Sequence, residues 1–160
     1  MTTILGIDPG PLSCGWAIYS NGKVVNSGGM SMDAVIVMMD SFPGFGVAIE
    51  RVQAQSKVGN EIMWTCEVSS HLYQAALDRG HEVHWIYRRE VLAALNASGK
   101  GTMDSLVRAR LMEAHGGATA KGTKKAPGPL YGVSTHAWAA LAVAWVAMQR
   151  IEKATTGGEK

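Results

Sequence analysis

The chain has 160 residues, a length that fits one domain with a sizeable core. Its 47% hydrophobic and 18% charged residues exclude a disordered chain, and its net charge of +2 excludes a uniformly basic protein. The charge is unevenly distributed, because residues 1–50 carry −3 and the remainder carries +5. The basic second part of the chain is compatible with a polyanionic partner. It is equally compatible with a charged face that only contacts water, because such a face has the same composition.

The two cysteines, Cys14 and Cys66, lack CxxC spacing, and no signal peptide is recognisable. This points to a reduced, cytoplasmic protein in which both thiols fill small spaces in the core. The apolar stretch 137–148 is shorter than the ~20 residues that span a bilayer, so we expect no membrane segment. We expect residues 1–153 to form a single domain and residues 154–160 to form a flexible tail.

The first predicted element is a buried strand, because the apolar run of ILGIDPG (4–10) ends at Asp8 and is followed by a Pro-Gly breaker. Residues 15–20 and 23–27 predict two further strands. The Asn21-Gly22 pair between them is the strongest short hairpin signal. These three strands are therefore expected to form an antiparallel meander.

A short helix and a second strand that ends on a carboxylate come next. Ser31 can cap a helix over residues 31–40, and Gly46 to Glu50 repeats the pattern of an apolar run followed by an acid. A strand reached through a helical crossover is usually parallel and adjacent to an earlier one. Pairing with the first strand would place Glu50 beside Asp8.

The second part of the chain predicts a long helix from Lys57 to Arg79, stopped by Gly80, and a strand at 82–87. Trp64 falls on a different face from much of the helix's apolar set, and this face is either further core or a dimer surface. The side chains expected on the buried face are Ile62, Met63, Cys66, Leu72, Tyr73, Ala76 and Leu77.

Two more helices are predicted at 88–96 and 102–115, followed by a mobile loop at 116–131 with almost nothing to bury. Ser134-Thr135 predicts the cap of a final apolar helix that ends near Glu152. His136 then lies in the first turn of that helix.

Two carboxylates at adjacent strand ends and a polar side chain at the start of a helix can bind Mg²⁺ or Mn²⁺. Two such ions about 3.5–4 Å apart could activate a water and stabilise the leaving oxygen of a phosphodiester, which is nuclease chemistry. Each residue also has a purely structural interpretation. Asp8 could start a turn, and His136 could be a satisfied or exposed histidine.

Three motifs together resemble the RuvC family of Holliday junction resolvases, in the ribonuclease H-like superfamily: ILGIDPG at 4–10, AIERVQ at 48–53 and HAWAALAVA at 136–144. The resemblance implies an α/β, ribonuclease H-like fold with a five-stranded mixed sheet flanked by helices. It also implies a homodimer and the metal-dependent, symmetric nicking of four-way, and of other branched, DNA junctions.

On the matching positions, the resemblance implies that Asp8 and Glu50 bind the metal, and that His136 binds a metal or orients the attacking water. The family's next acidic position falls on Ala139. Residues three apart share a helix face, and a methyl group cannot coordinate a cation. We therefore expect impaired catalysis, either because a natural Asp was replaced or because the protein is a degenerate DNA-binding relative, and expect Ala139→Asp to raise cleavage by orders of magnitude.

DNA contacts are expected on the basic side of the chain and at Gln53, which lies near a position where bacterial members of the family have a stacking aromatic residue. The side chains predicted to contact phosphates are Arg51, Lys100, Arg108, Arg110, Lys121, Lys124 and Lys125.

Three other functions compete with a junction endonuclease. Ala139 suggests a branched-DNA binding protein that does not cleave. The GIDPG motif also opens actin-like kinases, but the length of 160 residues argues against these, since they need a second domain to close over nucleotide, and no second phosphate-loop pattern is present. An RNA–DNA hybrid nuclease would share the metals and the fold, and would need only one protomer.

Overall fold

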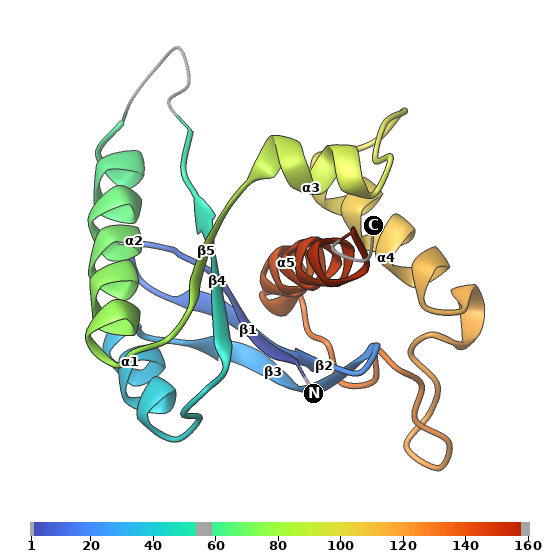
Figure 1. Cartoon of the computed structure of the whole chain (residues 1–160). Coiled ribbons are helices and arrows are strands. Elements are labelled where there is room, and N and C mark those ends of the chain that lie inside the picture. The colour runs from blue at the N-terminus through green and yellow to red at the C-terminus, as the bar shows by residue number, and fades with distance from the viewer. Residues whose placement is uncertain (1, 54–58, 158–160) are drawn as a thin grey trace.

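The protein, seen in a computed structural model that describes residues 2–53 and 59–157, is built on a five-stranded mixed sheet (Figure 1). The strands are β1 (Thr3–Asp8), β2 (Cys14–Ser20), β3 (Lys23–Met30), β4 (Gly46–Arg51) and β5 (Val83–Tyr87). Their order in the sheet is β3-β2-β1-β4-β5. β1 to β3 pair antiparallel, whereas β4 is parallel to β1 and β5 is parallel to β4. The predicted fold class is confirmed.

The meander turns at Asn21 and Gly22, which have φ angles of 51° and 74°. Positive φ at both central residues is what the Asn-Gly pair predicts. β3 continues beyond the predicted end at Ser27, because Gly28 and Gly29 still pair with β2.

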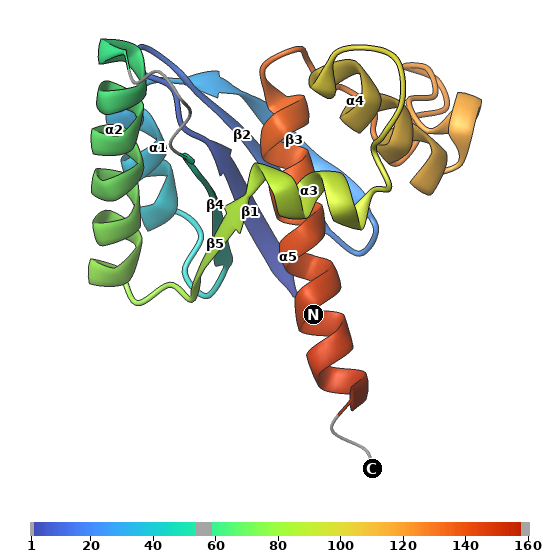
Figure 2. The ribbon, with the colours of Figure 1, turned by 90° about the horizontal axis from the view of Figure 1, so that it is seen from above.

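Helices cover both faces of the sheet (Figure 2). The helices are α1 (Met32–Asp40), α2 (Asn60–Asp78), α3 (Arg88–Ala94), α4 (Met103–Ala114), the 3₁₀ turn η1 (Gly117–Thr119) and α5 (Ala137–Gly157). α1 and α2 lie on one face, while α5 lies on the other and is itself covered by α3 and α4. The sheet therefore separates two apolar cores, one under α5 and one under α1 and α2.

The crossover through α1 brings two strand ends together. Ser31 caps α1 by accepting a hydrogen bond from the backbone N–H of Ala34, as predicted. β4 then pairs with β1 so that Ile49 lies opposite Ile7. The next residues along the two strands, Asp8 and Glu50, therefore lie at the same edge of the sheet.

The predicted buried face of α2 is wrong in part. Met63, Cys66 and Leu77 are exposed, and the helix buries Ser69, Leu72 and Ala76. Only one narrow face of α2 meets the sheet and α1, so the wider apolar set could not all be covered. Cys66 is thus no core filler, whereas Cys14 is buried as expected. The predicted start at Lys57 lies outside the described residues.

The segment between α4 and α5 buries more than predicted. Ala120 and Leu130 are buried, and the backbone N–H of Leu130 donates to the carbonyl of Ala120 at 2.7 Å. The backbone N–H of Val24 donates to the carbonyl of Pro129 at 2.8 Å, which ties the segment to β3. The expectation of almost nothing to bury was wrong, because two spaced apolar residues suffice to anchor a polar segment.

α5 begins at Ala137, immediately after His136, and extends to Gly157, beyond the predicted end near Glu152. Residues 154–157 therefore continue the helix. Within the described part of the chain, no helix has the length and apolar character needed to cross a membrane.

Candidate active site

Two acidic side chains meet at the carboxyl ends of β1 and β4. Glu50 is 9% exposed, and its Oε2 atom is buried with no hydrogen-bond partner among the described residues. Its other oxygen, Oε1, lies 2.9 Å from Nε of Arg88 in an ion pair. Asp8 is partly buried beside it. The site thus contains a buried carboxylate oxygen that no donor group of the described residues reaches, which is costly unless a cation or donor joins it, and the only hydrogen bond open to Glu50 there is a proton shared with the Asp8 carboxyl.

The pKa values of both carboxyl groups reflect this environment. Burial, followed by the neighbouring charge of Asp8, raises the pKa of Glu50 to about 7. Burial also raises the pKa of Asp8, although the charge of Arg88 opposes the rise. Two neighbouring carboxyl groups with raised pKa values at one edge of a sheet are typical of a functional site.

Two glycines bring the start of α5 to the same edge. A Cβ atom on Gly15, which pairs with Asp8, would overlap the carbonyl oxygen of His136. A Cβ atom on Gly6 would overlap the carbonyl oxygen of Ala140 in the next turn. Because neither glycine has a side chain, α5 lies directly on β1 and β2, with its first residues beside Asp8.

The side chains open into two adjoining clefts. The larger, of about 690 Å³, is lined by Asp8, His136 and Ala139, so the position of the expected acid does face the same space as the predicted ligands. The smaller, of about 510 Å³, is lined by Glu50, Asp8 and Gln53. Asp8 belongs to both clefts, whereas Glu50 and His136 do not line the same one.

Several lining residues were missed by sequence reasoning, and the charged and aromatic ones among them in the larger cleft are Arg88, Asp104 and Trp138. Arg88 lines both clefts and begins α3 directly after β5. A signal for it existed, because open α/β sheets place their ligand sites at the carboxyl ends of strands, and β5 ends one residue earlier. No comparable local signal marks Asp104, which comes from the first turn of α4.

Some of the predicted DNA contacts lie close to these clefts. Arg108 and Lys121 lie over the Trp138 ring, at 5.1 and 5.4 Å from its centroid. Arg51 lines the smaller cleft and lies over Trp85 at 5.3 Å. Cations held on aromatic faces in this way are attracted to the ring while their charge still faces outward.

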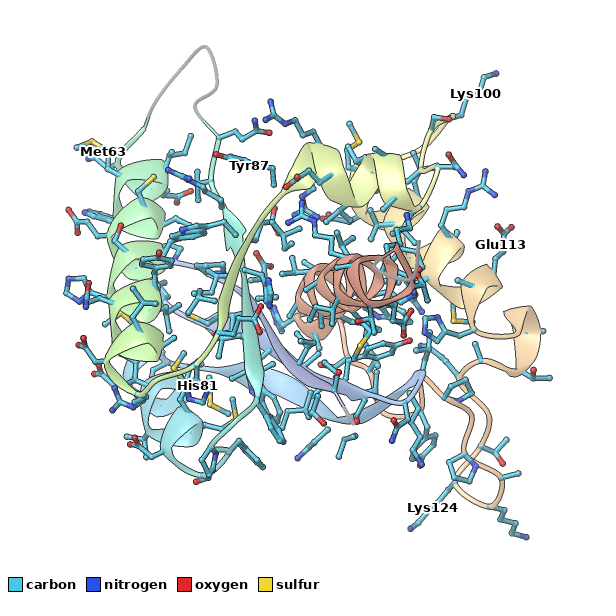
Figure 3. All side chains as sticks on the ribbon, in the orientation of Figure 1. Met63, His81, Tyr87, Lys100, Glu113 and Lys124 are labelled. Carbon is cyan, nitrogen blue, oxygen red and sulfur yellow. The ribbon has the colours of Figure 1, made fainter. Side chains whose placement is uncertain are left out.

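The other predicted contacts, Lys100, Arg110, Lys124 and Lys125, line neither cleft. Figure 3 shows Lys100 and Lys124 extending away from the molecule on the side of α4. Arg110 donates to Glu113 at 2.7 Å on the same helix. Their contact with DNA stays a prediction.

The carboxylate oxygens of the site suit a hard divalent cation such as Mg²⁺. Among residues 2–53 and 59–157, no three His, Cys, Asp or Glu side chains form a ready-made metal cluster. Mg²⁺ nevertheless commonly binds proteins through only one or two carboxylates, and takes its other oxygens from water and substrate phosphates. Asp8 and Glu50, with the unpartnered Oε2 atom of Glu50, fit such an ion.

No protein-family model and no curated protein sequence matches this chain. Solved structures do. The structure of Thermus thermophilus RuvC in complex with a Holliday junction substrate matches with a TM-score of 0.69 and 18% identity, over 96% of this chain and 98% of that chain. This chain has the RuvC fold. A second structure of Thermus thermophilus RuvC matches with a TM-score of 0.60 and 19% identity, over 98% of this chain and 97% of that one.

At these identities the likeness establishes the fold, and it extends over nearly the whole of both chains. The RuvC fold predicted from the three short motifs is therefore confirmed. It includes the ribonuclease H-like sheet order and the helix that lies across β1 and β2.

Proposed function

We propose that this chain is a metal-dependent endonuclease that nicks four-way and other branched DNA junctions symmetrically as a homodimer. The observation that carries the proposal is the pair of buried carboxyl groups, Asp8 and Glu50, with the unpartnered Glu50 Oε2 atom, at the edge where two clefts meet. Cations and an aromatic ring line the same clefts, as a nucleic-acid strand requires. The RuvC-fold protein from Thermus thermophilus binds a Holliday junction.

In this proposal Asp8 and Glu50 hold Mg²⁺ or Mn²⁺. When bound, the cation supplies positive charge that polarises the scissile phosphate. His136, which lines the cleft beside Asp8, orients the attacking water and accepts its proton. The water oxygen forms a bond to phosphorus, the bond from phosphorus to the leaving oxygen breaks, and that oxygen takes up a proton from solvent water.

The basic residues beside the clefts would hold the phosphates of the flanking strands. Arg51, Arg108 and Lys121 are the best placed, since they line a cleft or share the Trp138 ring. Such contacts position the strand and carry no base information. A protein that holds its substrate mainly in this way would act on branched DNA of varied sequence.

Ala139 makes catalysis slower than it would be with a carboxylate at this position. Its methyl group lines the larger cleft and offers nothing to a cation. The same observation favours a second candidate, a branched-DNA binding protein without turnover. The two candidates differ in whether a labelled junction is cut or only shifted in a gel.

The test is the incubation of a labelled synthetic four-way junction with Mg²⁺ and three proteins: the wild type, Ala139→Asp and Asp8→Asn. We expect weak paired nicks from the wild type, nicking increased by orders of magnitude in Ala139→Asp, and none in Asp8→Asn. A linear duplex of the same sequence is the substrate control. Junction shifting without nicks in all three proteins would support the binding protein, and neither shifting nor nicking would end both candidates.

A further inference from the structure

The Arg88 guanidinium already occupies the acidic site as a cation. Its Nε atom lies 2.9 Å from Oε1 of Glu50, and its Nη1 atom lies 3.6 Å from Oδ1 of Asp104. Arg88 lines both clefts, so it lies where they join. It reaches this place because α3 starts directly after β5, at the same edge of the sheet as Asp8 and Glu50.

The charges of the site balance with one divalent ion instead of two. Asp8 and Glu50 provide two negative charges when ionised, Arg88 provides one positive charge, and the exposed Asp104 is largely screened by water. A single Mg²⁺ or Mn²⁺ and one phosphate of the substrate then make the site neutral overall. Position 139, where a further carboxylate would call for more positive charge, holds an alanine that faces the same cleft.

We infer that Arg88 is the built-in second cation of this site, that one divalent ion binds per chain, and that Asp104 is a positioning residue for Arg88. This inference rests on the proposed nuclease function. Oε1 of Glu50 faces the guanidinium, whereas Oε2 is buried and no donor from residues 2–53 or 59–157 reaches it. That second oxygen, together with Asp8, remains for the divalent ion.

The guanidinium suits this role chemically. Its planar N–H groups match phosphate oxygens in pairs, and they do so better than an ammonium group. As the water oxygen bonds to phosphorus and the leaving oxygen departs, negative charge gathers on the non-bridging oxygens. Fixed donors at that place stabilise the transition state without reorganisation. Arg88 moves no proton in this scheme.

Asp104 is suited to positioning because it holds the outer end of the guanidinium. Its side chain is 85% exposed and lies in the first turn of α4, capped by Thr102. It therefore contributes little to a buried metal site by itself. Its contact with Nη1 restricts the rotation of the guanidinium away from Glu50.

The experiment is the titration of metal-free protein with Mn²⁺ by isothermal calorimetry, in parallel with junction cleavage. We expect one Mn²⁺ per wild-type chain. In Arg88→Gln, removal of the competing cation should give a second bound Mn²⁺ or at least about tenfold tighter binding, while cleavage falls about a hundredfold. Arg88→Lys should keep the wild-type stoichiometry with intermediate cleavage. In Asp104→Asn, Mn²⁺ affinity should change by less than about threefold and cleavage should fall about tenfold.

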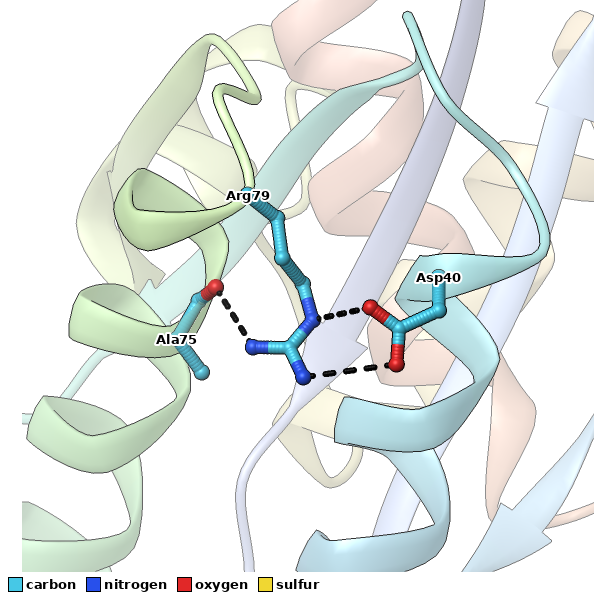
Figure 4. Close-up of polar contacts among 3 residues, drawn as sticks. All are labelled: Asp40, Ala75 and Arg79. Carbon is cyan, nitrogen blue, oxygen red and sulfur yellow. Dashed lines mark hydrogen bonds and ion pairs between the residues drawn. The ribbon is translucent and has the colours of Figure 1, made fainter.

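A matched control replaces an arginine whose ion pair lies away from both clefts. Arg79 donates from Nε to Asp40 at 2.6 Å, and from Nη1 to the carbonyl of Ala75 at 3.1 Å, on the α1 and α2 face of the sheet (Figure 4). Arg79→Gln should leave the stoichiometry, the Mn²⁺ affinity and the cleavage unchanged.

Two Mn²⁺ ions per wild-type chain, or weaker Mn²⁺ binding in Arg88→Gln, would overturn the assignment of Arg88. A tenfold loss of affinity in Asp104→Asn would make Asp104 a ligand and overturn its positioning role. If no variant cleaves a junction but Arg88→Gln binds more Mn²⁺, the proposed function fails while the cation assignment holds.

Discussion

Glu50 illustrates at the scale of one residue how a functional site costs stability. Its side chain is buried at the end of β4, close to Asp8, and a single guanidinium compensates it. Burial favours the neutral form, which is why the pKa of Glu50 rises to about 7. Metal-free protein therefore holds a proton on Glu50 over a pH range in which the unfolded chain has released it.

The first prediction is that metal-free protein becomes less stable as pH rises. The pKa of Glu50 is about 7 in the folded protein, whereas an unperturbed glutamate has a pKa of 4.5, so the favourable contribution is complete below pH 4.5 and is lost as pH rises through 7. This difference corresponds to a destabilisation on the order of 3 kcal/mol. Urea unfolding in EDTA at pH 4.5, 6 and 8 measures it.

Glu50→Gln should be much less sensitive to pH, because an amide does not ionise. Glu61→Gln, at an exposed position of α2, is the control and should follow the wild type. Equal pH slopes for the wild type and Glu50→Gln would contradict the prediction. Added Mg²⁺ should restore more stability at pH 8 than at pH 5, because it binds the ionised carboxylates.

At the scale of elements, the contact between α5 and the sheet positions the site. The side-chain-free positions Gly6 and Gly15 let the helix backbone lie on β1 and β2, and this places His136 and Ala139 above Asp8. α5 contributes much of the core on this face of the sheet. Stability and site geometry are therefore coupled through one helix.

Gly6→Ala is accordingly predicted to lower the stability of the protein and to weaken metal binding at the site. The new methyl group would overlap the carbonyl oxygen of Ala140 and lie 2.7 Å from the Cβ atom of Ala144. Overpacking of this kind costs about 1–3 kcal/mol. Denaturant unfolding should show the destabilisation, and Mn²⁺ binding should weaken as α5 is displaced. Val25→Ala, at an exposed position of β3, should stay within about 0.5 kcal/mol of the wild type.

The segment between η1 and α5 carries a second prediction at this scale. Lys121 lies over the Trp138 ring at the larger cleft, and Lys124 and Lys125 follow in the same segment. Replacing all three by Gln should reduce the slope of log K against log salt for junction binding, by about 0.9 for each phosphate that these lysines neutralise in the wild type. Lys153→Gln near the end of α5 is the control, and an unchanged slope in the triple variant would remove these lysines from the interface.

At the scale of the whole molecule, the two faces of the sheet differ in character. The α5 face carries the larger cleft, whereas α2, on the other face, exposes the apolar side chains of Met63 (Figure 3), Trp64 and Leu77. Symmetric nicking of opposed strands requires two sites related by a twofold axis. The apolar side of α2 is our proposed dimer surface, because α2 lies on the opposite face of the sheet from α5 and lines no part of the larger cleft.

Trp64→Glu should therefore convert the protein from dimer to monomer in sedimentation velocity. The physical reason is that a charge is placed at a half-exposed indole, where a partner helix would cover it. Cleavage should change from paired to single nicks. Val25→Glu, at a similarly exposed apolar position on β3, should leave the sedimentation coefficient unchanged. A wild type that sediments as a monomer would exclude the proposed interface.

The features that could be predicted from the sequence are those that neighbouring residues determine. The turn at Asn21-Gly22, the cap at Ser31 and the acids at the ends of β1 and β4 follow from backbone conformation and strand patterning. The crossover rule predicts from the sequence alone that Glu50 lies beside Asp8. Strand patterning and the parallel crossover were enough to predict this pair of acids, because the first depends on short segments of sequence and the second on the handedness of the chain.

Only the tertiary structure decided which distant side chains share the site and which apolar faces are covered. Arg88 follows the end of β5, which is a weak signal, but its partner Asp104 comes from α4, and nothing in the local sequence of Asp104 relates it to Arg88 or Glu50. Met63 and Cys66 have the spacing of core residues, yet no element packs on them in the described part of the chain. Ion pairs and burial depend on which elements meet across the sheet, and that is set by the packing of α5 and α2 against it and not by any short stretch of sequence.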